Sequence, residues 1–452
     1  RPGMARLASQ CGIKASLVGV DSEASASSHL GCAEAFLYFS ANKFGRTHPP
    51  SGSCPDAQAP FQPVDRLVSM KRLVLVGGGH AHLSVLEALA SQRPDDVEVT
   101  LITPSPRQNY SGMLPGWISG HYALPACQID LQPLVTAAGG QLILESVVGM
   151  DAARHCVGLG DGRHVHYDWL SIDVGSETAT SWLEALGNKL LPVKPLDSFF
   201  TRWPEGLADA QTKQAFRLVV VGAGAAGVEI ALAAQFALQR AGVQARVDLI
   251  ASENGVLKGH NPRVQERVLA YARRAGLAVH FQRAVGTEEG VLLADGQLLA
   301  ADLVIAATGA RAPVWLQLSK LALDQDGYIL VDGHHRSVSH PNVFAAGDVC
   351  ARPDARLSRS GVHAVRAGPV LARNLLAVLG SGPLRAYLPR PNALYLLACG
   401  PRYAIASWGP WSAEGGWVWR WKNWIDRRFI QRFARSTPGP VGAKVEKSIG
   451  PN

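Results

Sequence analysis

From about residue 70 onward, two kinds of segment alternate along the chain. Short runs in which nearly every position is apolar predict buried strands, and the stretches between them carry apolar residues at helical spacing. The first such unit has strands at Leu73–Val76 and Val97–Ile102, with a helix through Leu83, Leu86 and Leu89 between them. This alternation predicts a doubly wound α/β fold.

A second strand–helix–strand unit follows, with strands at Leu218–Val221 and Val247–Ile250 and a helix through Ile230 and Phe236. Further buried strands that each run into a glycine are expected at 169–174, 303–307 and 343–346. Between the two units, alternating apolar and polar positions predict short antiparallel strands. These segments are 141–148, 154–158 and 165–167.

The chain before Met70 shows no sustained periodicity. Residues 1–69 mix Ser, Ala, Pro and Gly, and the first residue is Arg. Met70 stands immediately before the first strand, so we interpret it as the natural start and 1–69 as a disordered or spurious extension. A targeting peptide is the alternative, although scattered acidic residues argue against it.

Composition indicates an ordinary globular chain with two or three domains. The 452 residues are 47% hydrophobic and 18% charged, and no apolar run reaches the roughly 18 residues of a transmembrane helix. The seven cysteines include no CxxC or CxxxxC pair, which argues against a redox dithiol or a zinc ribbon and favours a reducing compartment. We interpret four of the cysteines as structural, namely Cys127, Cys156, Cys350 and Cys399.

A glycine-rich turn follows the first strand of the second unit. It reads Gly-Ala-Gly-Ala-Ala-Gly, with glycines at Gly222, Gly224 and Gly227. Such a turn lets backbone N–H groups approach a pyrophosphate at the positive end of the next helix. Ala251 ends the second strand where an acid usually binds the ribose, so NADPH remains an alternative to NADH.

The first unit carries a weaker form of the same turn. Two of its glycines match, but His82 stands where the third glycine is expected. Its imidazole either holds the helix off the strand or faces the phosphates. The candidate contacts in this unit are Gly77, Gly78, Gly79, His80, His82 and Thr103. Two histidines beside a phosphate loop are too few for a metal site, so no metal is expected.

Three later strand ends complete the pattern, and they add Gly175, Thr308, Gly309, Gly347 and Asp348 to the candidate cofactor contacts. Together with the first glycine loop, the sequence resembles the FAD-dependent pyridine nucleotide-disulfide oxidoreductase superfamily. The resemblance implies FAD and NAD(P)H as cofactors and implies that Asp348 binds the ribitol of FAD.

Without a catalytic dithiol, the chain is most similar to type II NADH dehydrogenases. Within these it resembles a dehydrogenase-like module found fused ahead of selenophosphate synthetase, through three segments: 77–82, 110–116 and 419–429. The resemblance implies two Rossmann-like domains, with the FAD domain in two parts (70–182 and 313–380) around an NAD(P)H domain (213–312). Residues 183–212 would be a crossover linker, 381–435 a C-terminal α+β or helical interface segment, and 436–452 a tail.

Three residues are candidates for a catalytic role. Glu229 lies just after the second glycine loop, and the resemblance implies a place near the nicotinamide and the quinone; the alternative is a helix-end acid favoured by the dipole. Lys194 either reaches the flavin or is a solvated lysine. His363 occupies a position where the resembling dehydrogenases carry Gln, and either hydrogen-bonds a quinone or the flavin, or caps and packs.

The excess positive charge lies at the C-terminal end. Residues from 381 onward hold 11 Lys or Arg and 3 Asp or Glu, which matches the net charge of +8 for the whole chain. In a helix over 417–433, one stripe would hold Trp417, Val418, Trp421, Trp424, Ile425, Phe429 and Phe433. Such a helix is typical of docking to an anionic membrane surface. The alternatives are packing on the protein itself or a dimer contact; nucleic acid is not an expected partner.

We therefore predict a flavoprotein oxidoreductase that takes hydride from NAD(P)H to FAD and passes electrons to an acceptor, which the resemblance suggests is a quinone. One alternative is a soluble NAD(P)H-dependent reductase in selenium metabolism, and another is a non-catalytic flavin-binding scaffold. The expected location is cytoplasmic, with peripheral attachment to the inner face of the cell membrane, and a homodimer is left open.

Overall fold

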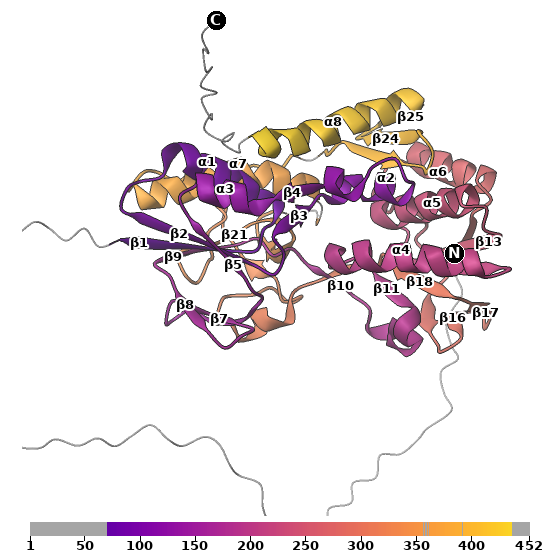
Figure 1. Ribbon diagram of the computed structural model, residues 1–452, viewed down its shortest axis with the longest axis horizontal. Coiled ribbons are helices and arrows are strands. Elements are labelled where there is room, and N and C mark those ends of the chain that lie inside the picture. Colours follow the sequence, from indigo (N-terminus) through magenta and orange to yellow (C-terminus); the bar gives the residue numbers. More distant parts are fainter. Residues whose placement is uncertain (1–69, 356, 358, 360, 391, 436–452) are drawn as a thin grey trace, which may run out of the picture. The chain divides into compact units, whose positions relative to one another are not determined.

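The computed structural model describes residues 70–435, apart from 356, 358, 360 and 391 (Figure 1). The predictions for 1–69 and 436–452 lie outside these residues. Among the described helices, none is long and apolar enough to cross a bilayer. The described part is built from two parallel sheets, each packed against its own helices, and a C-terminal meander with a final helix.

The first sheet has five parallel strands in the order β21-β9-β1-β2-β5. Their bounds are β1 Lys71–Val76, β2 Val97–Thr103, β5 Gln141–Leu144, β9 Trp169–Ile172 and β21 Val343–Ala345. Helices α1 (His80–Gln92), α3 (Leu131–Ala137) and α7 (Gly361–Leu379) cover one face (Figure 1). Because side chains alternate along a strand, Leu73 and Leu75 pack under these helices while Val74 and Val76 face the other side.

The opposite face is covered by an antiparallel meander of β6 (Val147–Asp151), β7 (Cys156–Leu159) and β8 (His164–His166). This confirms the antiparallel prediction for the second and third of the alternating segments. The antiparallel prediction was wrong for residues 141–144, which form β5 and pair in parallel with β2. An edge strand that is half-exposed shows the same alternation whichever direction its neighbour runs, so the pattern could not separate the two.

The second sheet is also parallel, in the order β11-β18-β12-β13-β14. Its strands are β11 Leu190–Pro192, β12 Phe216–Val221, β13 Ala245–Ala251, β14 Ala278–Phe281 and β18 Leu303–Ala306. One face packs on α4 (Leu196–Thr212), α5 (Ala225–Arg240) and α6 (Pro262–Arg274), and the other on β15 Ala284–Gly286, β16 Gly290–Leu293 and β17 Leu298–Ala300. The segment expected as a crossover linker, 183–212, contains α4 and β11, and β11 pairs with β18 in this sheet.

The C-terminal segment forms a three-stranded meander and the long helix α8. The bounds are β23 Tyr395–Ala398, β24 Ala404–Trp408, β25 Trp411–Gly415 and α8 Gly416–Arg435. Figure 1 shows α8 running along the top of the molecule above β24 and β25. Val418 and Trp419 pack with residues of β24, whereas Phe433 joins the core beneath α1. The helix therefore joins the meander to the first sheet unit.

Short elements complete the described chain. They are β3 Arg107–Asn109, η1 Ser111–Met113, α2 Leu114–Ile118, η2 Leu124–Cys127, β4 Gln128–Asp130, β10 Glu177–Thr178, η3 Ser181–Lys189, β19 Ala310–Arg311, η4 Val314–Leu318, β20 Ile329–Leu330, η5 Gly347–Val349 and β22 Cys350–Ala351. Strands β10 and β19 pair antiparallel where the chain passes between the two sheet units. The carboxyl ends of β1 and β9, where the strand order reverses, form the place at which open α/β sheets bind ligands.

Candidate functional site

The first glycine loop is pressed against the end of β9. Gly77 has a φ of +93°, and a Cβ there would lie 2.6 Å from the carbonyl oxygen of Asp173. A Cβ on Gly79 would clash with the same residue. Only glycine fits these two positions, and the loop delivers the chain directly into the N-terminus of α1. The dipole of that helix end favours a phosphate group.

Asp173 is a site residue that the sequence pattern did not reveal. Its carboxylate is buried, and Oδ2 accepts hydrogen bonds from the backbone N–H of Ala81 at 2.7 Å and of His82 at 3.0 Å. Burial raises the pKa of Asp173 to about 8, although these two N–H groups favour the charged form. Asp173 thus ties the first turn of α1 to β9, and Gly347 lies against its other oxygen.

His82 resolves the two alternatives left open for it. The ring is completely buried; Nδ1 lies 2.6 Å from the carbonyl oxygen of Gly77 and Nε2 lies 2.9 Å from Ser171 Oγ. Burial lowers the pKa of His82 to about 4, so the ring is neutral at pH 7. Both nitrogens are engaged within the protein, by Gly77 in the loop after β1 and by Ser171 on β9, so the ring offers no free nitrogen to a phosphate.

Asp348 lies at the end of the loop that follows β21, close to a lysine from the segment before α4. Its Oδ2 is 2.7 Å from Lys194 Nζ, and the same ammonium donates to Ser176 Oγ at 2.9 Å. Asp348 Oδ1 is buried and has no hydrogen-bond partner among the described residues. A buried carboxylate oxygen without a donor is unfavourable, so this atom marks a position for a polar ligand group. Lys194 is half-buried and paired, not a solvated lysine.

His80 brings the first loop together with the last helix. Its ring lies 5.6 Å from that of Tyr110 and 5.9 Å from that of Phe429, and Tyr110 stacks on Phe429 at 4.6 Å. Burial lowers the pKa of His80 to about 4, and its Nε2 has no partner among the described residues. A second buried polar atom is therefore available to a ligand beside the loop.

A buried group of charges lies where α8 crosses the chain after β3. Lys422 Nζ donates to the carbonyl oxygen of Gly112 at 2.6 Å and lies 2.9 Å from Asp426 Oδ2, while the hydroxyl of Tyr110 donates to Asp426 Oδ1 at 3.2 Å. Burial alone would lower the pKa of Lys422, but the charges of Asp426 and Glu229 raise it above its ordinary value. This ammonium therefore stays charged inside the protein, and α8 is fixed to the site by it.

Glu229 belongs to the same neighbourhood. It stands on α5, and its Oε1 accepts a hydrogen bond from the backbone N–H of Ala398 at 2.8 Å. Burial raises the pKa of Glu229 to about 7, and the charge of Lys422 opposes that rise. A carboxyl group with this pKa exchanges protons near neutral pH, which is the property required of a general acid or base. Glu229 therefore has two interactions beyond the helix dipole: the hydrogen bond from Ala398 and the attraction of the Lys422 charge.

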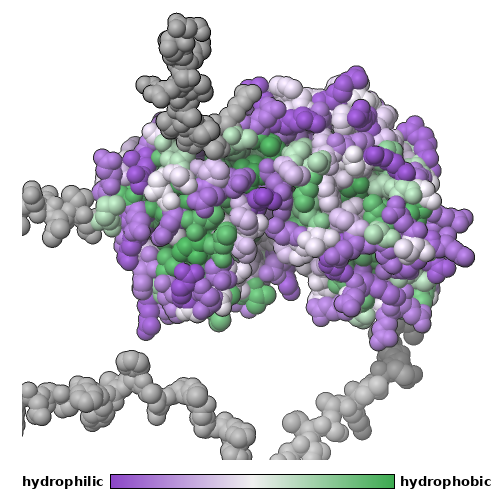
Figure 2. Space-filling model, in the orientation of Figure 1, coloured by the Kyte–Doolittle hydropathy of each residue, from purple (hydrophilic) through white to green (hydrophobic). Residues whose placement is uncertain are grey.

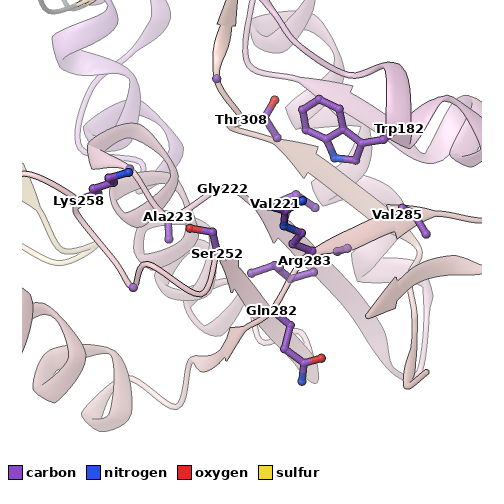
Figure 3. Close-up of a pocket in the computed structure, with 15 residues that line it drawn as sticks. Trp182, Val221, Gly222, Ala223, Ser252, Lys258, Gln282, Arg283, Val285 and Thr308 are labelled. Atoms are coloured by element: carbon purple, nitrogen blue, oxygen red, sulfur yellow. The ribbon is translucent and has the colours of Figure 1, made fainter. Parts of the chain in front are cut away.

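The second glycine loop leads to a pocket of about 560 Å³ (Figure 3). Gly222 has a φ of +106°, and a Cβ there would clash with the carbonyl oxygen of Ala307; one on Gly227 would clash with Gly222 itself. The pocket is lined by the loop, by the ends of β12 and β13 and by the turn after β14, and it includes Gly224, Thr308 and Gly309. This is the position expected for the second dinucleotide.

A second pocket, of about 500 Å³, is lined by His363, Tyr387, Tyr395 and several cations. Nδ1 of His363 lies 3.1 Å from the hydroxyl of Tyr387, and its Nε2 is buried without a partner among the described residues. Burial lowers the pKa of His363. His363 therefore has an unpartnered polar nitrogen and lines a cavity, and it also packs on Tyr387, so both of its expected roles are compatible with the structure.

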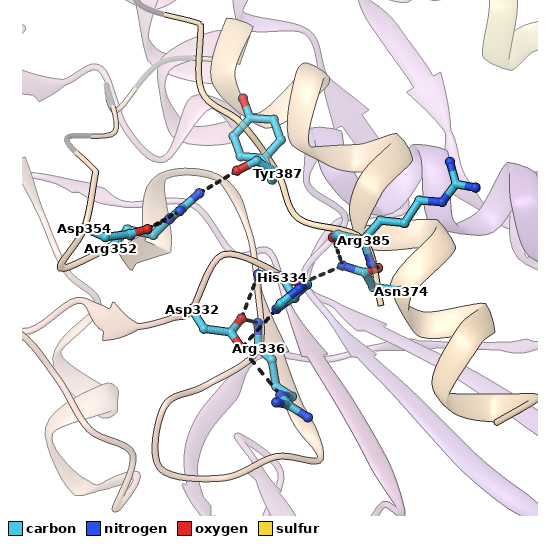
Figure 4. Close-up of polar contacts among 8 residues, drawn as sticks. All are labelled: Asp332, His334, Arg336, Arg352, Asp354, Asn374, Arg385 and Tyr387. Carbon is cyan, nitrogen blue, oxygen red and sulfur yellow. Dashed lines mark hydrogen bonds and ion pairs between the residues drawn. The ribbon is translucent and has the colours of Figure 1, made fainter. Parts of the chain in front are cut away.

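Tyr387 is held in position by polar contacts between its segment and α7 (Figure 4). Asn374 donates to the carbonyl oxygens of His334 at 2.8 Å and of Arg385 at 2.9 Å, and accepts from the backbone N–H of Arg385 at 2.8 Å. Arg352 donates to the carbonyl oxygen of Tyr387 at 2.7 Å. These contacts fix the phenol that positions the ring of His363.

Comparison with known proteins assigns the family. The family model described as pyridine nucleotide-disulphide oxidoreductase matches residues 71–368. The chain belongs to this family. Among curated proteins, it is 30% identical over 307 residues to an NADH dehydrogenase-like protein of Mycobacterium tuberculosis, covering 62% of this chain and 73% of that protein. It is 25% identical over 357 residues to the alternative NAD(P)H-ubiquinone oxidoreductase C1 of Arabidopsis thaliana, covering 69% and 68%.

Solved structures share the fold. The sulfide:quinone oxidoreductase of Aquifex aeolicus superposes with a TM-score of 0.70 at 17% identity, covering 82% of this chain and 93% of that one. NDH2 of Plasmodium falciparum in complex with NADH gives 0.68 at 14% identity, covering 82% and 99%. The predicted superfamily and fold class are confirmed, and the protein is an FAD-dependent NAD(P)H oxidoreductase. The non-catalytic scaffold is thereby set aside.

The residues of this pyridine nucleotide-disulphide oxidoreductase fit its cofactors. The tight first loop, the buried Oδ1 of Asp348 and the buried Nε2 of His80 provide a cradle and two polar atoms for FAD. Thr103 and Gly175 stand at the carboxyl ends of β2 and β9, beside the same loop. Thr308 is different, because its hydroxyl donates to the carbonyl oxygen of Ala179 and is engaged within the protein.

The four cysteines within the described residues are all free thiols. The four that were interpreted as structural are buried and unpaired. Burial raises the pKa of Cys127 and of Cys350 to about 12, so both are neutral thiols at pH 7. A thiol in that state is a weak nucleophile, in contrast to the disulfide reaction that gives the family its name.

Proposed function

We propose that this enzyme passes electrons from NAD(P)H through FAD to a quinone. When bound, FAD supplies hydride uptake from the nicotinamide and onward transfer of electrons. The overall reaction converts NAD(P)H, one proton and a quinone into NAD(P)⁺ and a quinol. The names of the relatives support the acceptor class, since one of them is an NAD(P)H-ubiquinone oxidoreductase.

The chain supplies the binding, orientation and proton for this reaction. Asp348 and Lys194 would hold the polar chain of FAD, and Asp173 fixes the helix end at which its phosphates would bind. Glu229, with a pKa of about 7, holds the additional proton that the quinol requires. Lys422 and Asp426 position that region by joining α8 to the carbonyl oxygen of Gly112.

The observation that supports the quinone proposal is the environment of His363. Its Nε2 is buried without a partner among the described residues, and His363 lines a pocket of a size suited to a small ring system. A neutral imidazole at this place donates or accepts one hydrogen bond to a quinone carbonyl. Tyr387 orients the ring through Nδ1 at 3.1 Å.

Steady-state oxidation of NAD(P)H by a short-chain ubiquinone analogue tests this proposal. We expect His363→Leu to raise the KM for the quinone roughly 10-fold, since one hydrogen bond to a polar group is lost. His363→Gln should retain it, and flavin content and flavin reduction by NAD(P)H should not change in either variant. An unchanged KM in His363→Leu contradicts the proposal. Turnover with selenite but not with quinone would favour the selenium alternative.

We also propose that the outward surface of α8 rests on an anionic membrane. The single stripe expected from the sequence is divided in the structure: Val418 and Phe433 are buried in the protein, while Trp417 and Trp424 are 48% and 58% exposed. Arg428 lies over the ring of Trp424 at 5.5 Å. In Figure 2, hydrophilic residues cover most of the surface over α8, so any attachment is shallow and depends on charge. Cosedimentation with anionic vesicles tests it.

A further inference from the structure

The pocket at the second glycine loop carries positive charge and no carboxylate. Its lining includes Lys258 and Arg283 together with the hydroxyl of Ser252, and none of its lining residues is Asp or Glu. Figure 3 shows the side chain of Arg283 in the pocket beside Val221, with Ser252 and then Lys258 farther toward the left of the view. Two cations around a hydroxyl are an anion-binding arrangement.

The pocket lies at the end of β13, where dinucleotide-binding domains distinguish the two nicotinamide cofactors. An acid at this strand end accepts hydrogen bonds from the ribose hydroxyls of NADH and repels the 2′-phosphate of NADPH. Here the strand ends in Ala251, which is fully buried and has no polar group, and Ser252 follows. Glu253 is next along the chain, but it does not line the pocket.

The two cations are available to a ligand. Arg283 stands in the turn between β14 and β15, and it is exposed, as is Lys258. Within the described part of the chain, neither side chain has an ion pair or a hydrogen bond, whereas Arg246, near the start of β13, is paired with Asp248. A guanidinium next to an acid is already neutralised, but Arg283 keeps its full attraction for a phosphate.

We propose that this pocket selects NADPH over NADH, with Arg283 and Lys258 binding the 2′-phosphate and Ser252 donating a hydrogen bond to it. The inference rests on the proposed function, because it names the electron donor for that reaction. Trp182 and Val285 line the same pocket and are 42% and 48% exposed, so they offer apolar surface for the adenine ring. The phosphate carries about two negative charges at neutral pH, which makes its recognition strongly dependent on these cations.

Calorimetric binding of NADP⁺ and NAD⁺ to the FAD-loaded protein tests the inference without turnover. We expect NADP⁺ to bind at least roughly 10-fold more tightly, and Arg283→Ala to weaken NADP⁺ binding roughly 10- to 100-fold while NAD⁺ binding stays within about twofold. Arg273→Ala is the matched control, because Arg273 is exposed in the same domain but does not line the pocket. Ser252→Asp should reverse the preference.

Anaerobic reduction of the flavin by each dinucleotide then separates this inference from the proposed function. The selection of NADPH is overturned if NAD⁺ binds as tightly as NADP⁺ or more tightly, or if the Arg283→Ala variant keeps its preference for NADP⁺. In that case, reduction of the flavin by NADH would still leave the proposed function intact. If neither dinucleotide reduces the flavin but NADP⁺ still binds through Arg283, the pocket inference holds and the proposed electron transfer fails.

Discussion

At the scale of single residues, burial determines which carboxyl groups near the site hold a proton. The pKa of Glu229 is raised to about 7 and that of Asp173 to about 8, in both cases chiefly by removal of the carboxyl from water. The two groups nonetheless have different surroundings. Asp173 accepts two backbone N–H groups at a helix end, which is a structural role, whereas Glu229 accepts one and faces a buried ammonium.

Glu229→Gln tests the proton-donating role. Because the pKa is raised to about 7, Glu229 is protonated below pH 7 and loses its proton above it, so quinone reduction by the unmodified enzyme should fall as the pH rises through 7. We expect Glu229→Gln to lower kcat roughly 100-fold and to remove this step in the pH profile. The exposed Glu266→Gln on α6 serves as the control. A Gln variant with the same pH profile as the unmodified enzyme would show that another group supplies the proton.

At the scale of elements, the glycine loops were predictable because their chemistry is local. Gly77 and Gly222 sit between a buried strand and a helix, and each requires a positive φ. The roles of Asp173 and Lys422 were not predictable, because Asp173 binds the start of α1 and Lys422 binds the carbonyl oxygen of Gly112, both far along the chain. The spacing of Lys422 and Asp426 on one helix face gave a faint signal, but only the fold shows that this face is buried against Gly112.

Helix α8 shows a further limit of the sequence pattern. Periodicity identified the helix and its apolar residues, but it could not tell which of them the protein itself covers. The structure buries Val418 and Phe433 and leaves Trp417 and Trp424 at the surface. The basic residues of the helix also differ in their surroundings: Lys422 is buried in an ion pair, whereas Arg420 is exposed.

The exposed tryptophans of α8 give a prediction at this scale. We expect the double variant Trp417→Ser, Trp424→Ser to bind anionic vesicles at least roughly 10-fold more weakly than the unmodified protein. Leu318→Ser is the control, because that side chain is 78% exposed on η4, away from α8. Binding should also weaken at high salt. Equal vesicle binding by both variants, or none by the unmodified protein, would exclude this surface as a membrane contact.

At the scale of the described part of the molecule, two parallel sheets each present a glycine loop at the carboxyl end of a central strand. The C-terminal segment links them, because β23 reaches Glu229 on α5 and α8 reaches Tyr110 and Gly112 after β3. Electron transfer between two bound rings requires a fixed distance, and this third segment supplies part of that rigidity. The family assignment and the two loops lead to the same central claim, that one chain holds both cofactors.

Anaerobic stopped-flow absorbance of the purified protein tests that claim most directly. The account predicts a visible flavin band that is bleached within one turnover by NADPH, more slowly by NADH, and is restored when a ubiquinone analogue is added. A protein that binds no FAD, or one whose flavin band is unaffected by both dinucleotides, would contradict it.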